Sequence, residues 1–173
     1  MKIGRCKAAA ISEITIDQNI DMAGFSLTDM GSLVMAANTG IQMLALLAVD
    51  GDWCGHTVLG IAGENLAAGD IVYLENADGR LWKADADAGL MPVKGMATAT
   101  ILAGATGVFL LDGFLREDDW TWAVGACLYA HTDPGAMVAI APANSGDEIQ
   151  RVAIAVTADI VNFRPSKDVM EVA

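Results

Sequence analysis

Short apolar runs bounded by Gly, Pro, Asp, Asn or Ser fill the last fifty residues of the chain. The runs cover residues 125–135, 137–142, 146–155 and 160–165. Such punctuation is typical of short strands joined by tight turns. This region therefore predicts rigid β-structure, and none of its residue sets resembles a reaction centre.

The same pattern extends upstream to residue 57. Further strand candidates are residues 57–62, 71–74, 80–84, 91–101 and 106–112. Asp78-Gly79 separates the second from the third and is a strong hairpin signal. Many short strands at a spacing of roughly 8–12 residues predict an all-β domain, built as a short-stranded barrel or sandwich.

The first 52 residues have a different pattern. Between residues 14 and 35 the apolar positions recur mostly at steps of two or three, with glycines among them, which suggests short strands with corners rather than a helix. Residues 42–48 fit a short helix or a buried strand equally well. We predict an extended N-terminal strand-and-corner arm over residues 1–52, which docks and contacts other subunits, and a β-domain over residues 53–173.

An approximate echo within the β-domain leaves open a division into two related halves. Residues 68–73 resemble residues 124–129, and a turn containing Gly follows each. The halves would be residues 53–113 and 122–166.

Composition favours an oligomer. Apolar residues make up 54% of the 173 residues and charged residues 18%, the mean hydropathy is +0.42, and the formal net charge is −12. Much apolar surface with few charges fits a chain that buries surface between subunits as well as within one. Composition therefore predicts an obligate oligomer.

The charge pattern disfavours two classes of partner. Residues 8–79 contain no Lys or Arg, so clustered positive charge for a phosphate backbone or an anionic membrane surface is missing. The uncharged run 32–49 is interrupted by polar residues and is a poor membrane span. Glu13 and Asp17 break any apolar core of a secretion signal. We expect neither nucleic acid nor membrane as a partner.

Few residues offer chemistry. Cys54 with His56, and Cys127 with His131, lie two and four residues apart, so on strands each pair could share a face and bind zinc. The spacing is uncommon for zinc, and buried thiols with surface imidazoles are the simpler interpretation. Catalytic motifs are missing from the sequence. We expect no cofactor and no metal, and do not expect an enzyme; the role of these four residues stays open.

The acidic stretch 115–122 carries Glu117, Asp118 and Asp119 beside Trp120 and Trp122. The two tryptophans fit side chains packed against the β-domain. They also fit a contact loop, because Trp is enriched at interface hot spots.

Several segments resemble bacteriophage capsid decoration (cement) and head-fibre proteins. The resemblance lies in residues 63–74, 78–86 and 103–113, and more closely in residues 125–166, whose end reads Asn162-Phe-Arg-Pro-Ser166. Residues 20–30 look like the strand-and-corner repeats of trimeric phage fibre shafts. The resemblance implies an all-β homotrimer on the outside of a capsid, with no catalytic residues to carry over.

Together these features predict a structural virion protein, made in the host cytoplasm and bound to the capsid exterior. Its partners would be itself, as a homotrimer, and the major capsid protein. The alternative is a receptor-binding tail-fibre or tail-tip protein that recognises a host surface glycan through residues 115–122; a small enzyme subunit is a third class. Head and tail locations both stay open. The candidate contact residues are Lys2, Arg5, Lys7, Phe25, Met30, Trp120 and Trp122.

Overall fold

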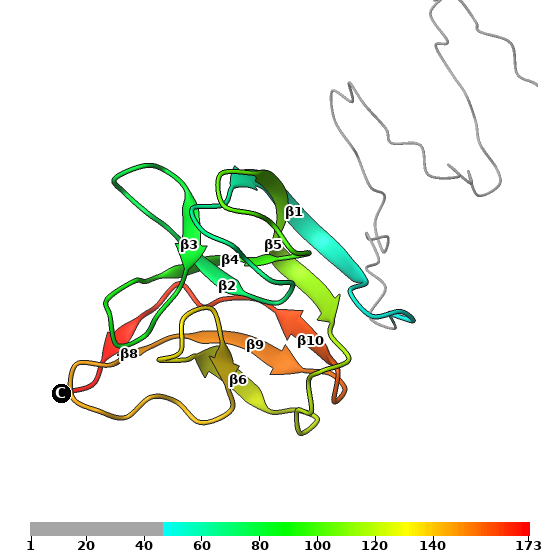
Figure 1. Cartoon of the computed structure of the whole chain (residues 1–173). Coiled ribbons are helices and arrows are strands. Elements are labelled where there is room, and N and C mark those ends of the chain that lie inside the picture. The colour runs from blue at the N-terminus through cyan, green and yellow to red at the C-terminus, as the bar shows by residue number, and fades with distance from the viewer. Residues whose placement is uncertain (1–46) are drawn as a thin grey trace, which may run out of the picture. The chain divides into compact units, whose positions relative to one another are not determined.

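The computed structural model describes residues 47–173, and these form antiparallel β-structure without a helix (Figure 1). The chain divides into two units, residues 1–40 and 41–173, and the described residues belong to the second. The expectation of an all-β domain is confirmed. The strands are β1 (Trp53–Ile61), β2 (Ile71–Leu74), β3 (Leu81–Lys83), β4 (Val93–Ala97), β5 (Thr106–Arg116), β6 (Cys127–Ala130), β7 (Met137–Val138), β8 (Glu148–Ile149), β9 (Arg151–Ala155), β10 (Ile160–Phe163) and β11 (Met170–Glu171).

The main sheet is organised around β5. Its strand order is β3-β2-β4-β5-β10-β9-β6-β7, and β1 lies along the other side of β5. Strand β4 pairs with β5 at Phe109 and Leu110, whereas β10 pairs with it further on, from Gly113 to Arg116. The long strand β5 thus pairs with two groups of strands. The upper group in Figure 1 consists of β1, β2, β3 and β4, and the lower group consists of β6, β7, β9 and β10. Strands β8 and β11 form a separate two-stranded ribbon.

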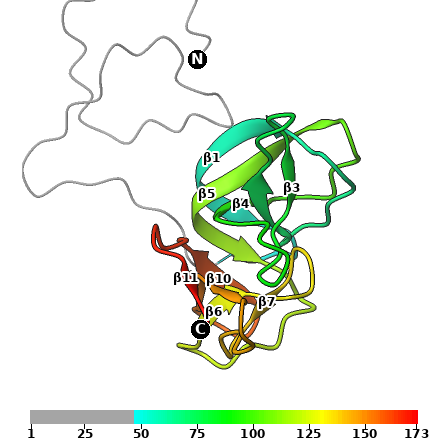
Figure 2. The same cartoon turned by 90° about the vertical axis from the view of Figure 1, so that its left-hand side faces the viewer.

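The upper group curls into a half-barrel. Strand β1 pairs with β5 over its whole length, and the two strands curve side by side in Figure 2. Just past β1, Ala62 forms a bridge with Leu81 of β3, and the Gly63 N–H donates to the Leu81 carbonyl at 2.8 Å. The curl therefore brings the end of β1 back to the far strand of the same group.

Two apolar clusters pack on the two faces of β5. Because successive side chains of a strand point to opposite faces, neighbouring residues of β5 enter different clusters. Phe109 packs inside the half-barrel with Leu81 and Val72. Leu110 packs in the larger cluster, which also contains Phe163 and other residues of the lower group.

Glycine is required where β1 and β5 approach most closely. Gly55 lies opposite Gly113 in the register, and each has φ +154. A Cβ at Gly55 would collide with the backbone carbonyl of Asp112, and a Cβ at Gly113 with that of Cys54. A register shift follows at once, between His56 and Thr57. The bend of this strand pair depends on two backbones meeting without side chains.

A buried glutamine links the two groups of strands. Gln150, which is 1% exposed, accepts a hydrogen bond from the Val93 N–H at 2.8 Å through Oε1. Its Nε2 donates to the Ser166 carbonyl at 2.7 Å. One side chain thus connects β4 to the chain segment that follows β10.

Local turn signals located several strands correctly. The predicted strand 71–74 is β2, and the predicted Asp78-Gly79 hairpin joins it to β3, with Gly79 at φ +67. The Glu75 N–H donates to the Arg80 carbonyl at 2.9 Å to close the turn.

Other bounds were wrong. The predicted acidic loop 115–122 is shorter, because β5 continues through Arg116, where β10 pairs with it. Regular pairing within the predicted strand 91–101 is limited to β4, and residues 146–155 split into β8 and β9. Strand β11 was not predicted. The proposed arm lies almost wholly outside the described residues, so the division at residue 52 stays a prediction, as do the two related halves.

Candidate contact surfaces

The acidic loop is held in place by Arg116 at the end of β5. The guanidinium Nε donates to Asp118 Oδ1 at 2.7 Å, and Nη2 lies 2.9 Å from Asp159 Oδ2. Nη1 donates to the Leu47 carbonyl at 3.1 Å. A further hydrogen bond runs from the Asp118 N–H to Asp50 Oδ1, at 2.8 Å. The loop is thereby fixed to the segment before β1 and to the turn before β10.

Trp120 and Trp122 both point toward the domain. Each is half-buried and packs against the larger apolar cluster, with 6.3 Å between the ring centroids. The Trp120 ring covers Gly69, where a Cβ would lie only 2.8 Å from Trp120 Cζ2. The indole Nε1 of Trp122 is shielded from solvent and has no hydrogen-bond partner among residues 47–173. The structure thus gives these side chains a packing role, and their role as a partner contact stays a prediction.

Carboxylates surround the same loop. Partial burial raises the pKa of Glu117, and the negative charges of Asp50, Asp119 and Asp118 raise it further. The hydrogen bond to Asp118 raises the pKa of Arg116. One arginine therefore faces several acidic groups, and the surface around it attracts cations rather than anions.

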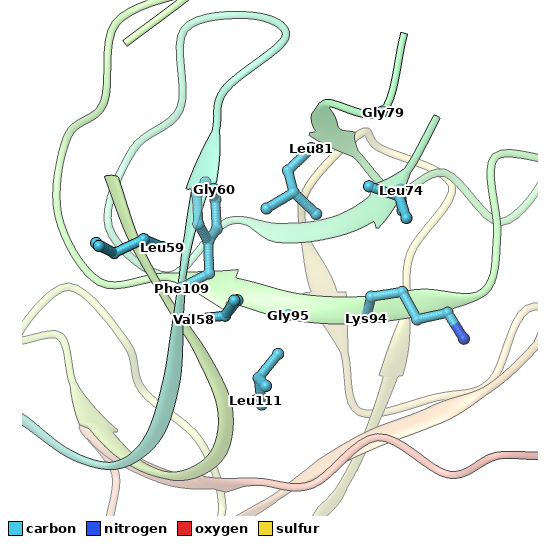
Figure 3. A pocket seen from close by; sticks show the side chains of 10 residues that line it. All are labelled: Val58, Leu59, Gly60, Leu74, Gly79, Leu81, Lys94, Gly95, Phe109 and Leu111. Atoms are coloured by element: carbon cyan, nitrogen blue, oxygen red, sulfur yellow. The ribbon is translucent and has the colours of Figure 1, made fainter. Parts of the chain in front are cut away.

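A second surface lies at the half-barrel. A groove of about 390 Å³ opens between β1 on one side and β2 and β3 on the other (Figure 3). Leu81 and Phe109 are buried at its base, whereas Val58, Leu74 and Leu111 in its walls are 42%, 50% and 40% exposed. Gly60 and Gly95 also line it and leave it open, because they have no side chains.

Strand β1 presents apolar residues on both of its faces. Val58 lies opposite Phe109 in the register and so faces the groove, while Leu59, which also lines the groove, points to the alternate face of the strand and is 71% exposed. Trp53 and Ile61 are also exposed. Among residues 47–173, the strand paired with β1 is β5, on one side.

The sequence did not identify this groove as a candidate site. Its lining comes from the five strands β1 to β5, whose contact depends on the curl of the sheet. One signal was present, since residues 57–62 form a nearly continuous apolar run. Such a run is typical of a strand buried on both faces, which β1 is not.

The metal candidates do not come together. Cys54 and His56 lie on β1, and Cys127 lies on β6, a strand that does not neighbour β1 in the sheet. His131 Nδ1 accepts a hydrogen bond from the Asp133 N–H at 2.7 Å and so supports a local turn. Groups of three or more His, Cys, Asp or Glu side chains that could hold a metal ion are absent from residues 47–173.

The remaining predicted contact residues, Lys2, Arg5, Lys7, Phe25 and Met30, lie outside the described residues. Among residues 47–173, no helix has the length and apolar character that crossing a membrane requires. A scan against protein-family models finds no match, and a search of curated proteins finds none either.

Proposed function

We propose that this protein is a structural virion component, a trimeric decoration or head-fibre protein that binds the outside of a phage capsid and stabilises it. The observation that carries the proposal is the apolar strand β1 beside an apolar groove. Exposed apolar side chains gathered in one place mark surfaces that another protein covers. The all-β fold and the resemblance of residues 125–166 to phage virion domains support the same proposal.

The proposed mechanism is mechanical. Each trimer bridges neighbouring capsid subunits, and its binding energy opposes their separation under internal pressure. The arm over residues 1–52 docks and contacts other subunits, with the basic residues Lys2, Arg5 and Lys7 facing an acidic surface of the major capsid protein. Charges at such a rim increase the rate of association more than the affinity.

The alternative of a glycan-binding tail protein would use residues 115–122. Trp120 and Trp122 pack against the domain core, which limits the ring surface left for stacking on a sugar. This geometry favours the decoration role.

Two measurements test the proposal. Native mass spectrometry of the full chain at micromolar concentration should give a trimer, and a stable monomer would contradict it. Immuno-electron microscopy of particles from the producing cells should place the label over the head shell. Label at the tail tip would support the alternative instead, and particles without label would overturn both.

A further inference from the structure

Along residues 57–61, the side of β1 that does not pair with β5 is open among residues 47–173, and it is the feature of the described domain that most requires a partner. Edge strands are normally short, charged or covered, because their free N–H and C=O groups and apolar side chains bind other strands. Strand β1 has nine residues, and its second half carries Val58, Leu59 and Ile61, all exposed. The groove continues this apolar surface toward β2 and β3.

Residues 13–22 of the same sequence have the pattern of a strand that would fit there. The even positions are Ile14, Ile16, Gln18, Ile20 and Met22, and the odd positions are Glu13, Thr15, Asp17, Asn19 and Asp21. One face is thus apolar except for Gln18, and the other is polar with three carboxylates. This period of two is the signature of a strand with one buried face.

One positive charge lies beside the groove. Lys94 is the charged residue of the groove, and its ammonium group points away from the apolar base in Figure 3. Lys94 forms no ion pair with any residue from 47 to 173. Between residues 8 and 46 every charged side chain is acidic. With the apolar face of the segment over the groove, Glu13, Asp17 and Asp21 would lie on the outer face of the added strand, so Lys94 attracts them only at long range.

We propose that residues 13–22 of a neighbouring copy add a strand beside residues 57–61 of β1, with their apolar face over the groove. Main-chain hydrogen bonds then provide affinity and the groove provides register, as in other cases of strand addition. This inference rests on the proposed homotrimer.

Symmetry favours this occupant over a second β1. Pairing β1 with β1 of another copy uses the same surface twice and gives a two-fold dimer. Contact between an N-terminal segment and a groove uses two different surfaces, and such a contact can close into a three-membered ring.

The first test compares full-length variants by analytical ultracentrifugation. Val58→Asp and Leu111→Asp each place a carboxylate in the groove, and Ile16→Asp places one on the apolar face of the segment. Each should raise the concentration at which the trimer dissociates by about tenfold or more, because a charge is buried at the contact.

Two matched variants control for the added charge. Thr15→Asp adds the same charge on the polar face of the segment, and Val124→Asp replaces a 74% exposed residue that does not line the groove. Both should leave the dissociation concentration nearly unchanged. Equal effects from Ile16→Asp and Thr15→Asp would overturn the inference.

The second test identifies the contact directly. Full-length chains with benzoylphenylalanine in place of Ile16 are dissociated, mixed with ¹⁵N-labelled wild-type chains, reassembled and irradiated. Crosslinks from position 16 to residues 57–61 or 107–111 of labelled chains support the inference. If the protein is a trimer but its crosslinks lie elsewhere, or only within one chain, the inference is wrong and the proposed homotrimer stands. If the wild type is a monomer, both the inference and the proposed homotrimer are wrong.

Discussion

The two groups of strands that share β5 treat their exposed apolar residues differently. In the half-barrel, Val58, Leu74 and Leu111 gather around one groove. In the lower group, Val124, Ile140 and Ile154 are exposed, but none of them lines this groove. Scattered apolar residues are ordinary on protein surfaces, and a gathered patch marks contact. This contrast supports our proposal that the half-barrel is the part of the domain that binds a partner.

The largest effect should come from the small cluster behind the groove. Phe109 is fully buried there, so Phe109→Ala should lower the free energy of unfolding by about 3–5 kcal/mol through lost burial and a new cavity. Leu111→Ala, two residues along in the exposed wall, should cost less than about 1 kcal/mol. Denaturant unfolding of the full chain measures both, and similar losses would show that the wall is as tightly packed as the base.

Backbone contact between β1 and β5 should give the next largest effect. Gly113→Ala puts a Cβ against the Cys54 carbonyl at a φ that disfavours side chains, and should cost about 2–3 kcal/mol. Gly104→Ala is the control, since its φ of +77 is also unfavourable but no atom lies within 4 Å of the added Cβ. It should cost about 1 kcal/mol, the strain alone. If the two losses are equal, the close approach contributes nothing.

The link between the two groups can be broken at Gln150. Gln150→Leu leaves the buried Val93 N–H without its acceptor and should cost about 1–3 kcal/mol. Thr98→Val is the matched control within the half-barrel. It removes the hydroxyl hydrogen bond to the Val108 carbonyl, but that carbonyl still accepts from the Thr98 N–H at 3.3 Å. Thermal unfolding should therefore separate the variants, with the smaller change at Thr98.

The smallest effect concerns pH and the β8–β11 ribbon. Burial, and then the negative charge of Glu171 opposite it, raise the pKa of Glu148 above its ordinary 4.5. The folded protein thus holds this proton more tightly than the unfolded chain, so the contribution of Glu148 to stability falls as pH rises from about 4.5 through the raised pKa. Glu148→Gln should flatten this part of the stability–pH curve.

Glu171→Gln separates the two causes of this shift. It removes the opposing charge but not the burial, so it should flatten the curve only in part. Glu75 and Asp159, whose pKa values are lowered, act in the opposite sense and lose their contribution as pH falls. An unchanged curve in Glu148→Gln would contradict the assignment of the effect to Glu148.

Features that depend on neighbouring residues in sequence were predictable. The β2–β3 hairpin follows from an Asp-Gly turn between two apolar runs, and β2 has its predicted bounds. The full length of β5 was not predictable, because its last residues are held by β10, more than forty residues later. The same reason applies to β11, because its partner β8 lies more than twenty residues earlier in the chain.

The candidate surfaces were also predictable only where they depend on residues that are neighbours in sequence. The sequence identified the loop that carries Trp120 and Trp122 as a candidate contact. It could not predict that Trp120 packs inward over Gly69, because the two residues lie more than fifty positions apart in the chain. The groove was not predicted because its lining comes from all five strands from β1 to β5. Only the curl of the sheet brings Val58, Leu74 and Leu111 together.

The position of β5 has a consequence for dividing the protein. A cut in the chain between residues 123 and 125 would leave β5 in the first fragment and its partner β10 in the second. Each fragment would then hold part of the larger apolar cluster and could not bury it alone. The two pieces should recover the native fold only when mixed, so this protein is a natural candidate for fragment complementation.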